Sequence, residues 1–470
     1  GAWMRHAFDA IVVGAGQAGP SLAVRLAGAG RRVAMVERKL FGGTCVNNGC
    51  TPTKAMVASA HAAHLARRGA DFGVQTGPVT VDMRAVKARK DAIVMKSRTG
   101  VEKWLRGTEN CTVFTGTAVF ESPNSMRVGD DVLEASQIFL NVGARPTVPK
   151  MPGTDSVRFL TSTTILDLEE LPAHLIVVGG GYVGLEFAQM FRRFGSEVTI
   201  VDRSARLAPQ EEEDTSRVIH EVFAAEGIQV RVNANCIHLE QRGIHLDQRG
   251  SDVAVGLECD EDAPHAVGSH VLLAVGRTPN TGDLNLAAAG VKTDERGYIP
   301  VDDELRTNVP GIYALGDCNR RGAFTHTSYN DYEIVAENLL DGASRRLSDR
   351  IPVHALYIDP PLAHVGMTEA EVRASGRPAL VGMRPMTRVN RAIEKGETYG
   401  YMKVFVDAET RHILGATIFG TGGDEAIHCI LTAMYAKQPA SLLTHSVHIH
   451  PTVAELIPTT LEDLKPLAAP

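Results

Sequence analysis

Two stretches of the chain share one order of apolar and polar positions. Each starts with a run of apolar residues, 10–13 in the first stretch and 175–178 in the second, and a glycine-rich turn follows. After the turn, apolar residues recur at helical spacing until a second apolar run ends in an acidic residue. A short apolar run beside a glycine turn predicts a buried strand, and the helical spacing predicts a helix. The sequence therefore predicts two strand–turn–helix–strand units.

The glycines of both turns point to nucleotide binding. In such a motif they let the backbone approach a pyrophosphate at a helix N-terminus, and the acid that ends the next strand accepts hydrogen bonds from a ribose. One such motif also arises for steric reasons alone. Here it occurs twice with the acid in register, so two bound dinucleotides are expected. The positions are Gly14, Gly16, Gly19 and Glu37 in the first copy and Gly179, Gly181, Gly184 and Asp202 in the second.

Further apolar runs divide the chain into domains. Runs at 137–142, 271–275 and 312–315 predict strands, and the Pro/Gly-rich stretch 148–153 predicts a linker. The C-terminal part mixes strand-like runs with a helical pattern at 426–436 and has no nucleotide motif. We expect an α/β fold with two Rossmann-like domains and a C-terminal α+β domain. The ranges are 1–152 and 283–349 for the two parts of the first domain, 153–282 for the second and 350–470 for the third.

Composition narrows the class of partner. The 470 residues are 44% hydrophobic and 22% charged, as in a soluble globular protein, and the formal net charge is −7. Because there is no long basic run, neither nucleic acid nor a membrane surface is an expected partner, and no apolar stretch approaches the length of a membrane span. Seven scattered cysteines favour a reducing, cytoplasmic location over secretion. Residues 1–4 resemble an expression scar, and small molecules are the expected partners.

Two cysteines stand close together after the first unit. Pro52 suits a first helical turn and 55–68 is rich in alanine, so Cys50 is expected at a helix N-terminus, where the helix dipole favours a thiolate. Cys45 can form a disulfide with Cys50 if the turn brings their Cα atoms within roughly 7 Å. A zinc site would need a second pair, so no metal is expected. The remaining cysteines are isolated and expected to be buried packing residues, with Cys429 the least certain: Cys111, Cys236, Cys259, Cys318 and Cys429.

A second group of chemically active residues lies near the C-terminus. His450 and Glu455 can form a general acid–base unit in which the carboxylate orients the imidazole for proton exchange with a thiol. His445 and His448 lie close by, and three histidines so near each other are also compatible with a metal site. Packing or solvent-facing roles for His445 and His448 stay open as well.

Together these segments resemble the FAD-containing disulfide reductases, the family of glutathione reductase, dihydrolipoamide dehydrogenase and mercuric reductase. The resemblance covers nearly the whole chain. It rests on the two glycine-rich repeats and on Gly-Gly-Thr-Cys-Val-Asn-Asn-Gly-Cys-Thr-Pro-Thr-Lys at 42–54, Val-Gly-Arg-Thr-Pro-Asn at 275–280, Leu-Gly-Asp at 315–317, and His-Pro-Thr at 450–452 with Glu455.

The resemblance implies catalytic roles at matching positions. Cys50 is similar to the thiolate that contacts the flavin and forms a charge-transfer complex with it. Cys45 is similar to the interchange thiol that attacks the substrate. Lys54 and Glu186 would form an ion pair near the flavin N5.

The same resemblance implies an obligate homodimer and two cofactors. His450 would reach the active site of the other subunit across an interface built by the C-terminal domain. The positions implied for FAD are Gly14, Gly16, Gly19, Glu37 at the adenosine ribose, Gly43, Thr44, Lys54, Ala118, Gly143 and Asp317 at the ribityl chain. Those implied for NAD(P) are Gly179, Gly181, Tyr182 as a lid over the nicotinamide pocket, Gly184, Asp202, Arg203 and Gly276.

The implied cycle uses both cysteines. Hydride passes from NAD(P)H to FAD, and two electrons open the Cys45–Cys50 disulfide. Cys45 then attacks an oxidised substrate, His450 protonates the departing group and Cys50 restores the disulfide. We expect NADH as the electron donor, because Asp202 would repel a 2′-phosphate. Arg203 and the nearby Arg206 favour NADPH instead, so use of both cofactors stays open.

The substrate class is less constrained. Residues 50–54 resemble mercuric reductase, but the His-Pro-Thr catalyst that this enzyme replaces is present, 461–470 lacks its cysteine pair, and no Cys-x-x-Cys metal-binding domain precedes residue 10. Segment 322–331 resembles the bacterial branch of reactive-chlorine-resistance flavoproteins. We expect an enzyme acting on a small disulfide or on a thiol-reactive oxidant such as hypothiocyanite. The alternatives are a mercuric reductase, a dihydrolipoamide dehydrogenase working in the oxidative direction and, least favoured, a redox sensor without turnover.

Overall fold

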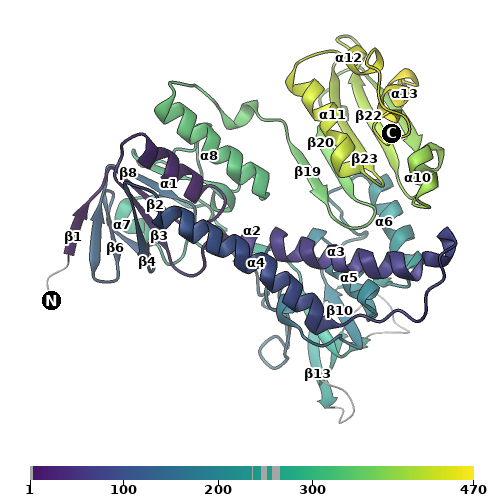
Figure 1. The fold of residues 1–470 in the computed structure, drawn as a ribbon, viewed down its shortest axis with the longest axis horizontal. Helices are drawn as coiled ribbons and strands as arrows, with labels where there is room; N and C mark the ends of the chain where they lie inside the picture. The colour runs from purple at the N-terminus through teal and green to yellow at the C-terminus, as the bar shows by residue number, and fades with distance from the viewer. Residues whose placement is uncertain (1–3, 236, 245–250, 257–264, 470) are drawn as a thin grey trace.

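The computed structural model describes residues 4–235, 237–244, 251–256 and 265–469. Figure 1 shows three parts: two units built on parallel sheets and a C-terminal part, drawn in yellow, built on an antiparallel sheet. Two Rossmann-like units followed by an α+β domain confirm the predicted fold class. The domain boundaries given above stay predictions.

The first unit is organised around a five-stranded parallel sheet in the order β18-β8-β2-β3-β4, beside a smaller mixed sheet in the order β1-β7-β6-β5. Every residue of β2 and β3 is buried, because helices and the second sheet cover both faces. Its elements are β1 (Met4–Ala7), β2 (Ala10–Val13), α1 (Gly19–Gly28), β3 (Val33–Glu37), α2 (Gly43–Asn47), α3 (Cys50–Arg67), η1 (Gly69–Phe72), α4 (Met83–Arg106), β4 (Cys111–Thr115), β5 (Ala118–Ser122), β6 (Ser125–Val128), β7 (Asp131–Glu134), β8 (Gln137–Leu140), β9 (Ala144–Pro146), α7 (Leu286–Ala289), β18 (Ile312–Ala314), η3 (Gly316–Asn319) and α8 (Thr325–Leu340).

The second unit has a parallel sheet in the order β12-β11-β10-β16 and a three-stranded antiparallel sheet, β13-β14-β15. Its elements are η2 (Thr164–Asp167), β10 (His174–Val178), α5 (Tyr182–Phe194), β11 (Glu197–Val201), α6 (Glu213–Ala225), β12 (Gln229–Arg231), β13 (His238–Ile244), β14 (Ser251–Gly256), β15 (His265–Gly268), β16 (His270–Leu273) and β17 (Arg277–Pro279), of which β17 pairs with β9 of the first unit. The chain then returns to the first unit, where β18 pairs with β8. Two separate parts of the chain therefore complete the first sheet.

The C-terminal part is a six-stranded antiparallel sheet in the order β19-β20-β23-β22-β21-β24, with α11 packed on β20 and β23. Its elements are η4 (Leu347–Asp349), β19 (Val353–Leu356), β20 (Leu362–Gly366), α9 (Glu369–Ala374), β21 (Ala379–Pro385), η5 (Met386–Arg388), α10 (Asn390–Glu394), β22 (Tyr401–Asp407), β23 (Ile413–Phe419), α11 (Gly423–Tyr435), α12 (Ser441–Thr444), α13 (Leu456–Glu462) and β24 (Lys465–Pro466). The helical pattern expected at 426–436 is therefore α11, and the strand-like runs expected here include β22.

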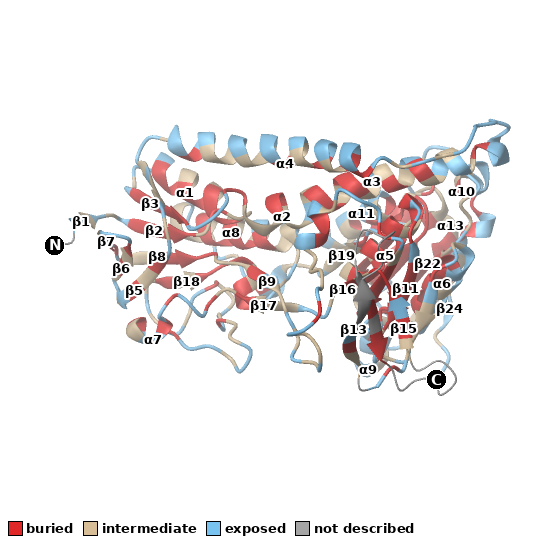
Figure 2. Cartoon of the chain, turned by 90° about the horizontal axis from the view of Figure 1, so that it is seen from below, coloured by how far each residue is buried: buried red, intermediate tan, exposed pale blue. Residues whose placement is uncertain are grey.

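Two long helices connect the units. Helix α3 packs against α4 on one side and against α5 of the second unit on the other. Figure 2 shows α4 lying across the molecule with much of its length exposed. None of the helices in the described part of the chain combines the length and the apolar character needed to span a bilayer.

Candidate active site

A cavity of about 470 Å³ lies between the glycine turn after β2 and the cysteine segment. Four of the predicted catalytic residues line this cavity: Cys45, Cys50, Lys54 and Glu186. All positions predicted for FAD except Gly19 also line it, namely Gly14, Gly16, Glu37, Gly43, Thr44, Lys54, Ala118, Gly143 and Asp317. The fold therefore gathers residues from distant parts of the chain around one cavity.

The glycine turn is too tight for side chains. Gly14 has φ +104°, and a Cβ there would lie 2.1 Å from the carbonyl oxygen of Asn141. A Cβ at Gly19 would lie 2.0 Å from the carbonyl oxygen of Gly14. Gly19 thus brings the start of α1 onto the turn, and this explains why it is required without lining the cavity. The resulting cradle at a helix N-terminus fits the pyrophosphate of FAD.

The carboxylate of Glu37 is held next to this turn. Its Oε2 accepts a hydrogen bond from the N–H of Ala15 at 2.7 Å, and its Oε1 accepts one from the N–H of Lys39 at 3.0 Å. Each carboxylate oxygen can accept a further bond. Glu37 is therefore fixed in place and still able to bind ribose hydroxyls.

Asp317 lies in η3, directly after β18, and lines the same cavity as the cysteines. Burial raises the pKa of its carboxyl group, and the positive charge of Arg277 opposes that rise. The turn is braced by buried Asp331, which accepts hydrogen bonds from the N–H of Gly316 and from Arg350, both at 2.8 Å. This arrangement fits a carboxylate that binds ligand hydroxyls, the role expected of Asp317.

Cys45 and Cys50 lie in two consecutive helices, the short α2 and the long α3. Cys45 lies within α2, and Cys50 is the first residue of α3, with Pro52 in the first turn. The alanine-rich stretch 55–68 therefore belongs to a helix that begins at Cys50, so Cys50 lies at a helix N-terminus as predicted. The two thiols are not linked and hydrogen-bond to each other. Their redox roles stay predictions.

The two sulfur atoms differ in their affinity for a proton. The hydrogen bond from Cys45 is the main cause that lowers the pKa of Cys50, to about 5; burial opposes it, and Thr325 and the positive charge of Lys54 add to it. The same hydrogen bond, together with burial, raises the pKa of Cys45. At neutral pH the pair therefore carries a thiolate on Cys50 and a proton on Cys45.

Thr325 is a site residue whose role the sequence did not predict. It is the first residue of α8, and its hydroxyl donates a hydrogen bond to Sγ of Cys45 at 3.0 Å. The same oxygen lies 3.5 Å from Sγ of Cys50. The segment 322–331 resembles a branch of the family, but nothing in the sequence indicates that Thr325 contacts cysteines so far away in the chain.

Replacing Thr325 with Val should move the titration of the Cys50 thiolate upward by about one pH unit. The hydroxyl lies 3.5 Å from Sγ of Cys50 and can turn from Cys45 to donate to the Cys50 thiolate, which lowers the pKa of that thiol. A hydrogen bond to a charged group contributes roughly 1.5 kcal/mol, and the change removes it while keeping the side-chain shape. The measurement is the pH dependence of alkylation of Cys50 in the reduced enzyme. Thr325→Ser, which keeps the hydroxyl, should titrate like the parent. An unchanged midpoint in Thr325→Val would show that the hydroxyl does not stabilise the thiolate.

Lys54 and Glu186 form the predicted ion pair, with 2.9 Å between Nζ and Oε1. The N–H of Tyr357 donates to the same Oε1 at 2.9 Å, and Nζ of Lys54 lies 4.8 Å from the centroid of the Tyr357 ring. Tyr357 follows β19, so the C-terminal domain reaches the ion pair through this residue. Nothing in the sequence distinguishes Tyr357 from an ordinary tyrosine at a strand end.

His450 and Glu455 also pair as predicted, at 2.6 Å between Nδ1 and Oε1. The other carboxylate oxygen of Glu455 accepts a hydrogen bond from the N–H of Thr452 at 2.8 Å, and the pKa of Glu455 is lowered mainly by the bond to His450. The His450 side chain is 64% exposed and does not line the cavity of its own chain. Within the described residues, His445 and His448 do not bring their ring nitrogens together with it.

The positions predicted for NAD(P) follow the carboxyl ends of β10, β11 and β16, and none of them lines this cavity. Gly179 and Gly184 repeat the packing of the first copy, because a Cβ at either would lie 2.1 Å from a carbonyl oxygen. A Cβ at Gly180 would lie 3.0 Å from Oδ2 of Asp202, so this carboxylate sits against the turn. The remaining predicted positions in this group are Gly181, Tyr182, Arg203 and Gly276.

Two arginines follow Asp202 and differ in their contacts. Arg206 donates to the carbonyl oxygens of Pro209 and Glu211, at 3.3 and 2.8 Å, so its guanidinium is engaged by the backbone. Arg203 is exposed. The acid thus lies against the glycine turn, whereas the Arg206 guanidinium is bound to backbone carbonyl oxygens that follow it.

Tyr182 begins α5, one residue before Val183 in the cavity lining. Its hydroxyl hydrogen-bonds to the carboxylate of Glu211 and lies 3.1 Å from Nε2 of His354, and its ring stacks on that of His354. Burial raises the pKa of the hydroxyl. The tyrosine is therefore tied to the C-terminal domain, and its role as a nicotinamide lid stays a prediction.

The isolated cysteines fit the packing role expected of them where they are described. Cys318 is fully buried, and burial raises its pKa to about 12; burial raises the pKa of Cys111 to about 11. Cys429 is half-buried in α11 and lies in no cluster of metal-ligating groups among the described residues. Cys236 and Cys259 lie outside the described residues.

Comparison with known proteins decides the family. Residues 8–331 match the model of the pyridine nucleotide-disulphide oxidoreductases, and residues 353–461 match the dimerisation domain of the same family. The chain belongs to this family. Pyridine nucleotide-disulphide oxidoreductases of this type are FAD-dependent enzymes that use NAD(P)H, so these are the cofactors of this chain.

Individual relatives match over nearly their full length. The chain is 36% identical to the probable pyridine nucleotide-disulfide oxidoreductase RclA of Escherichia coli, over 95% of this chain and 97% of the relative. It is 35% identical to a mercuric reductase of Streptomyces lividans, over 96% and 94%. Among solved structures, the Cu(II) complex of the HOCl-induced flavoprotein disulfide reductase RclA from Escherichia coli superposes with a TM-score of 0.87 at 33% identity, covering 97% of this chain and 99% of that one.

Proposed function

We propose that this oxidoreductase uses NAD(P)H to reduce a small disulfide or a thiol-reactive oxidant at Cys45 and Cys50. The observation that carries the proposal is that the two adjacent cysteines lie in the cavity wall, beside the Thr325 hydroxyl and the Lys54–Glu186 ion pair. When bound, FAD supplies electron transfer between the nicotinamide and sulfur. The protein positions the Cys50 thiolate at the N-terminus of α3, beside the Lys54 ammonium group.

Cys45 is the thiol that we propose attacks the substrate. Because its pKa is raised, it needs a base before it becomes a nucleophile. We propose His450 as that base: the bond from Nδ1 to Glu455 fixes the ring and leaves Nε2 available for proton exchange. The same nitrogen would protonate the thiol that departs from a disulfide substrate.

An obligate homodimer would bring His450 to the cysteines of the other subunit. In its own chain the imidazole is largely exposed and lies outside the cavity lining. The neighbouring apolar residues Val447 and Ile449 are 101% and 79% exposed, an unfavourable arrangement unless another surface covers them. The family's dimerisation domain includes this segment. A second copy of the chain therefore completes the proposed site.

A soft or borderline metal ion is the second candidate substrate. One similar solved structure is described as a Cu(II) complex, and one relative is described as a mercuric reductase. Two adjacent sulfur atoms, one of them a thiolate, are suitable ligands for such ions. Reduction of Cu(II) or Hg(II) would then use the same electrons and the same cysteine pair.

A steady-state screen separates these substrates. NADH and NADPH are each combined with lipoamide, glutathione disulfide, hypothiocyanite, Cu(II) and Hg(II). We expect turnover with a disulfide or hypothiocyanite that is lost in Cys45→Ser. Turnover with the metal ions alone would establish the second candidate instead, and turnover that survives loss of both cysteines would overturn both.

We expect NADH to be preferred over NADPH, with Asp202 as the cause. A carboxylate against the glycine turn repels a 2′-phosphate, and Arg206 is engaged by backbone carbonyls. Asp202→Asn should therefore improve kcat/KM for NADPH by roughly tenfold, the equivalent of about 1.4 kcal/mol, with a smaller change for NADH. Arg203→Gln is the matched control and should leave the ratio of the two kcat/KM values nearly unchanged. A large loss of NADPH use in Arg203→Gln would assign the selectivity to that arginine.

A further inference from the structure

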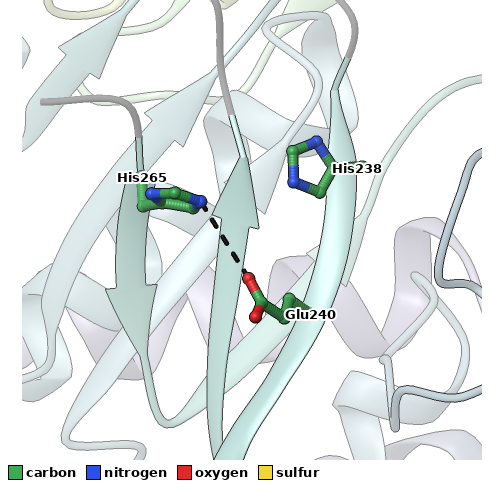
Figure 3. A group of neighbouring side chains, drawn as sticks. All are labelled: His238, Glu240 and His265. Carbon is green, nitrogen blue, oxygen red and sulfur yellow. Dashed lines mark ion pairs between the residues drawn. The ribbon is translucent and has the colours of Figure 1, made fainter.

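We propose that His238, Glu240 and His265 bind a divalent transition-metal ion such as Zn(II) on the three-stranded sheet of the second unit. One ligand atom from each residue lies within 4.8 Å of the others, and Nε2 of His265 lies 4.0 Å from Oε2 of Glu240 (Figure 3). Two imidazoles and a carboxylate are a ligand set that Zn(II) binds in proteins. None of the three residues lines the redox cavity, so this site is separate from the cysteines.

The register of the strands explains how the two histidines meet. His238 in β13 and His265 in β15 are both paired with Gly256 of the intervening strand β14. Neighbouring strands lie roughly 4.8 Å apart, so the two histidine backbones are separated by about twice that distance. The rings close the gap above β14, where their centroids are 6.1 Å apart.

Gly256 makes this approach possible. A Cβ at this position would lie 1.8 Å from Cε1 of His238, so any larger residue would push the ring away. The glycine therefore leaves a space over the middle strand that the imidazole occupies. A glycine weakens a strand, so a glycine in a sheet often marks a place where another group approaches closely. At Gly256 that group is the His238 ring.

Glu240 completes the ligand set from the same side of the sheet. It lies two residues after His238, and alternate residues of a strand point to the same face. The opposite face carries buried Leu239, Val255 and Ala266, which pack in the core of the second unit. That core holds the sheet in place while the three ligands face outward, with side-chain exposures of 50% for Glu240 and 34% for His265.

Metal binding requires only modest side-chain movement. Bonds to Zn(II) of about 2.0–2.2 Å bring ligand atoms closer to each other than they are here. Because the Glu240 and His265 side chains are partly exposed, they can make this adjustment without repacking the core. The ion would replace the His265–Glu240 ion pair and join β13 to β15 across β14. Three protein ligands leave one position for water.

The test uses the FAD-loaded enzyme carrying Cys45→Ser and Cys50→Ser, so that Zn(II) cannot bind at the redox pair. Competition for Zn(II) against a chromophoric chelator should give one site per chain. Adding His265→Ala should weaken binding at least tenfold, because even partners that only orient metal ligands contribute roughly tenfold to hundredfold. Glu240→Gln, which keeps the side-chain shape, should also weaken it.

His445→Ala in the same background is the matched control and should leave the affinity unchanged. If it removes Zn(II) binding, the site belongs to the C-terminal histidines and the proposal fails. Equal Zn(II) affinity with and without His265 would also overturn it. Val267 lies on the outward face of β15 and is 45% exposed. Val267→His adds a fourth possible ligand beside His265 and should tighten Zn(II) binding. These outcomes do not depend on turnover, so they stand apart from the proposed reductase activity.

Discussion

Replacing Cys45 with Ser should abolish disulfide turnover, by on the order of a thousandfold or more, because the proposed nucleophile is lost. The same variant should keep the long-wavelength absorbance that arises when a thiolate contacts the flavin, because a serine hydroxyl can still donate a hydrogen bond to Cys50, and Thr325 and Lys54 still favour its thiolate. Cys50→Ser should lose both turnover and absorbance. Anaerobic titration with NADH, followed by absorbance, and a steady-state disulfide assay measure the two properties separately.

The pH dependence provides a second criterion for the assignment of the thiolate. A thiol with a lowered pKa is already deprotonated at neutral pH. Its thiolate therefore persists as the pH falls, until the pH reaches the pKa. With the pKa of Cys50 at about 5, the absorbance of the reduced enzyme should remain at neutral pH and fade as the pH falls through about 5. Fading near the pKa of an ordinary thiol, or absorbance that depends on Cys45 instead of Cys50, would contradict the assignment.

Mixing two inactive variants should restore activity if the site is shared between subunits. Cys45→Ser and His450→Ala homodimers each lack an essential group in both sites. A heterodimer formed from the two places one intact pair, Cys45 with His450 from the other chain, in one of its two sites. Random exchange of subunits should therefore recover roughly a quarter of the parent activity.

The exchanged sample must be compared with the same variants mixed without subunit exchange, which should stay inactive. A double variant, with both changes in one chain, is the matched control: exchanged with the parent enzyme, it leaves no site with a full set of groups in the heterodimer. With a shared site, exchange should therefore reduce the activity of this control mixture by about half, because only the remaining parent homodimers stay active. Undiminished activity in the control, with none recovered in the Cys45→Ser and His450→Ala mixture, would place His450 in the site of its own chain.

The local elements of this molecule are predictable because each depends on neighbouring residues. The runs 10–13 and 175–178 became buried strands of parallel sheets, and the glycine turns after them have the packing that only glycine allows. Cys50 begins α3 because Pro52 is accepted in a first helical turn. The Lys54–Glu186 pair joins two distant helices and was predictable only through family likeness. The His450–Glu455 pair was predictable from the chemistry of two residues close together in the chain.

Residues that act through tertiary contacts could not be found in this way. Thr325 reaches the two sulfurs only because α8 begins beside α2 and α3. Tyr357 contacts Glu186 only because the C-terminal domain docks there. Likewise, His238 and His265 become neighbours through the register of three strands, which no spacing along the chain discloses.

Helix α3 has a consequence for how electrons travel. It carries Cys50 at its first residue, packs along α5 of the second unit and is joined to it by the Lys54–Glu186 pair. At about 1.5 Å per residue, its 18 residues form a rod of roughly 27 Å. This rod fixes the sulfur atoms relative to both nucleotide units. The separation of Cys50 from the second unit is thus set when the chain folds.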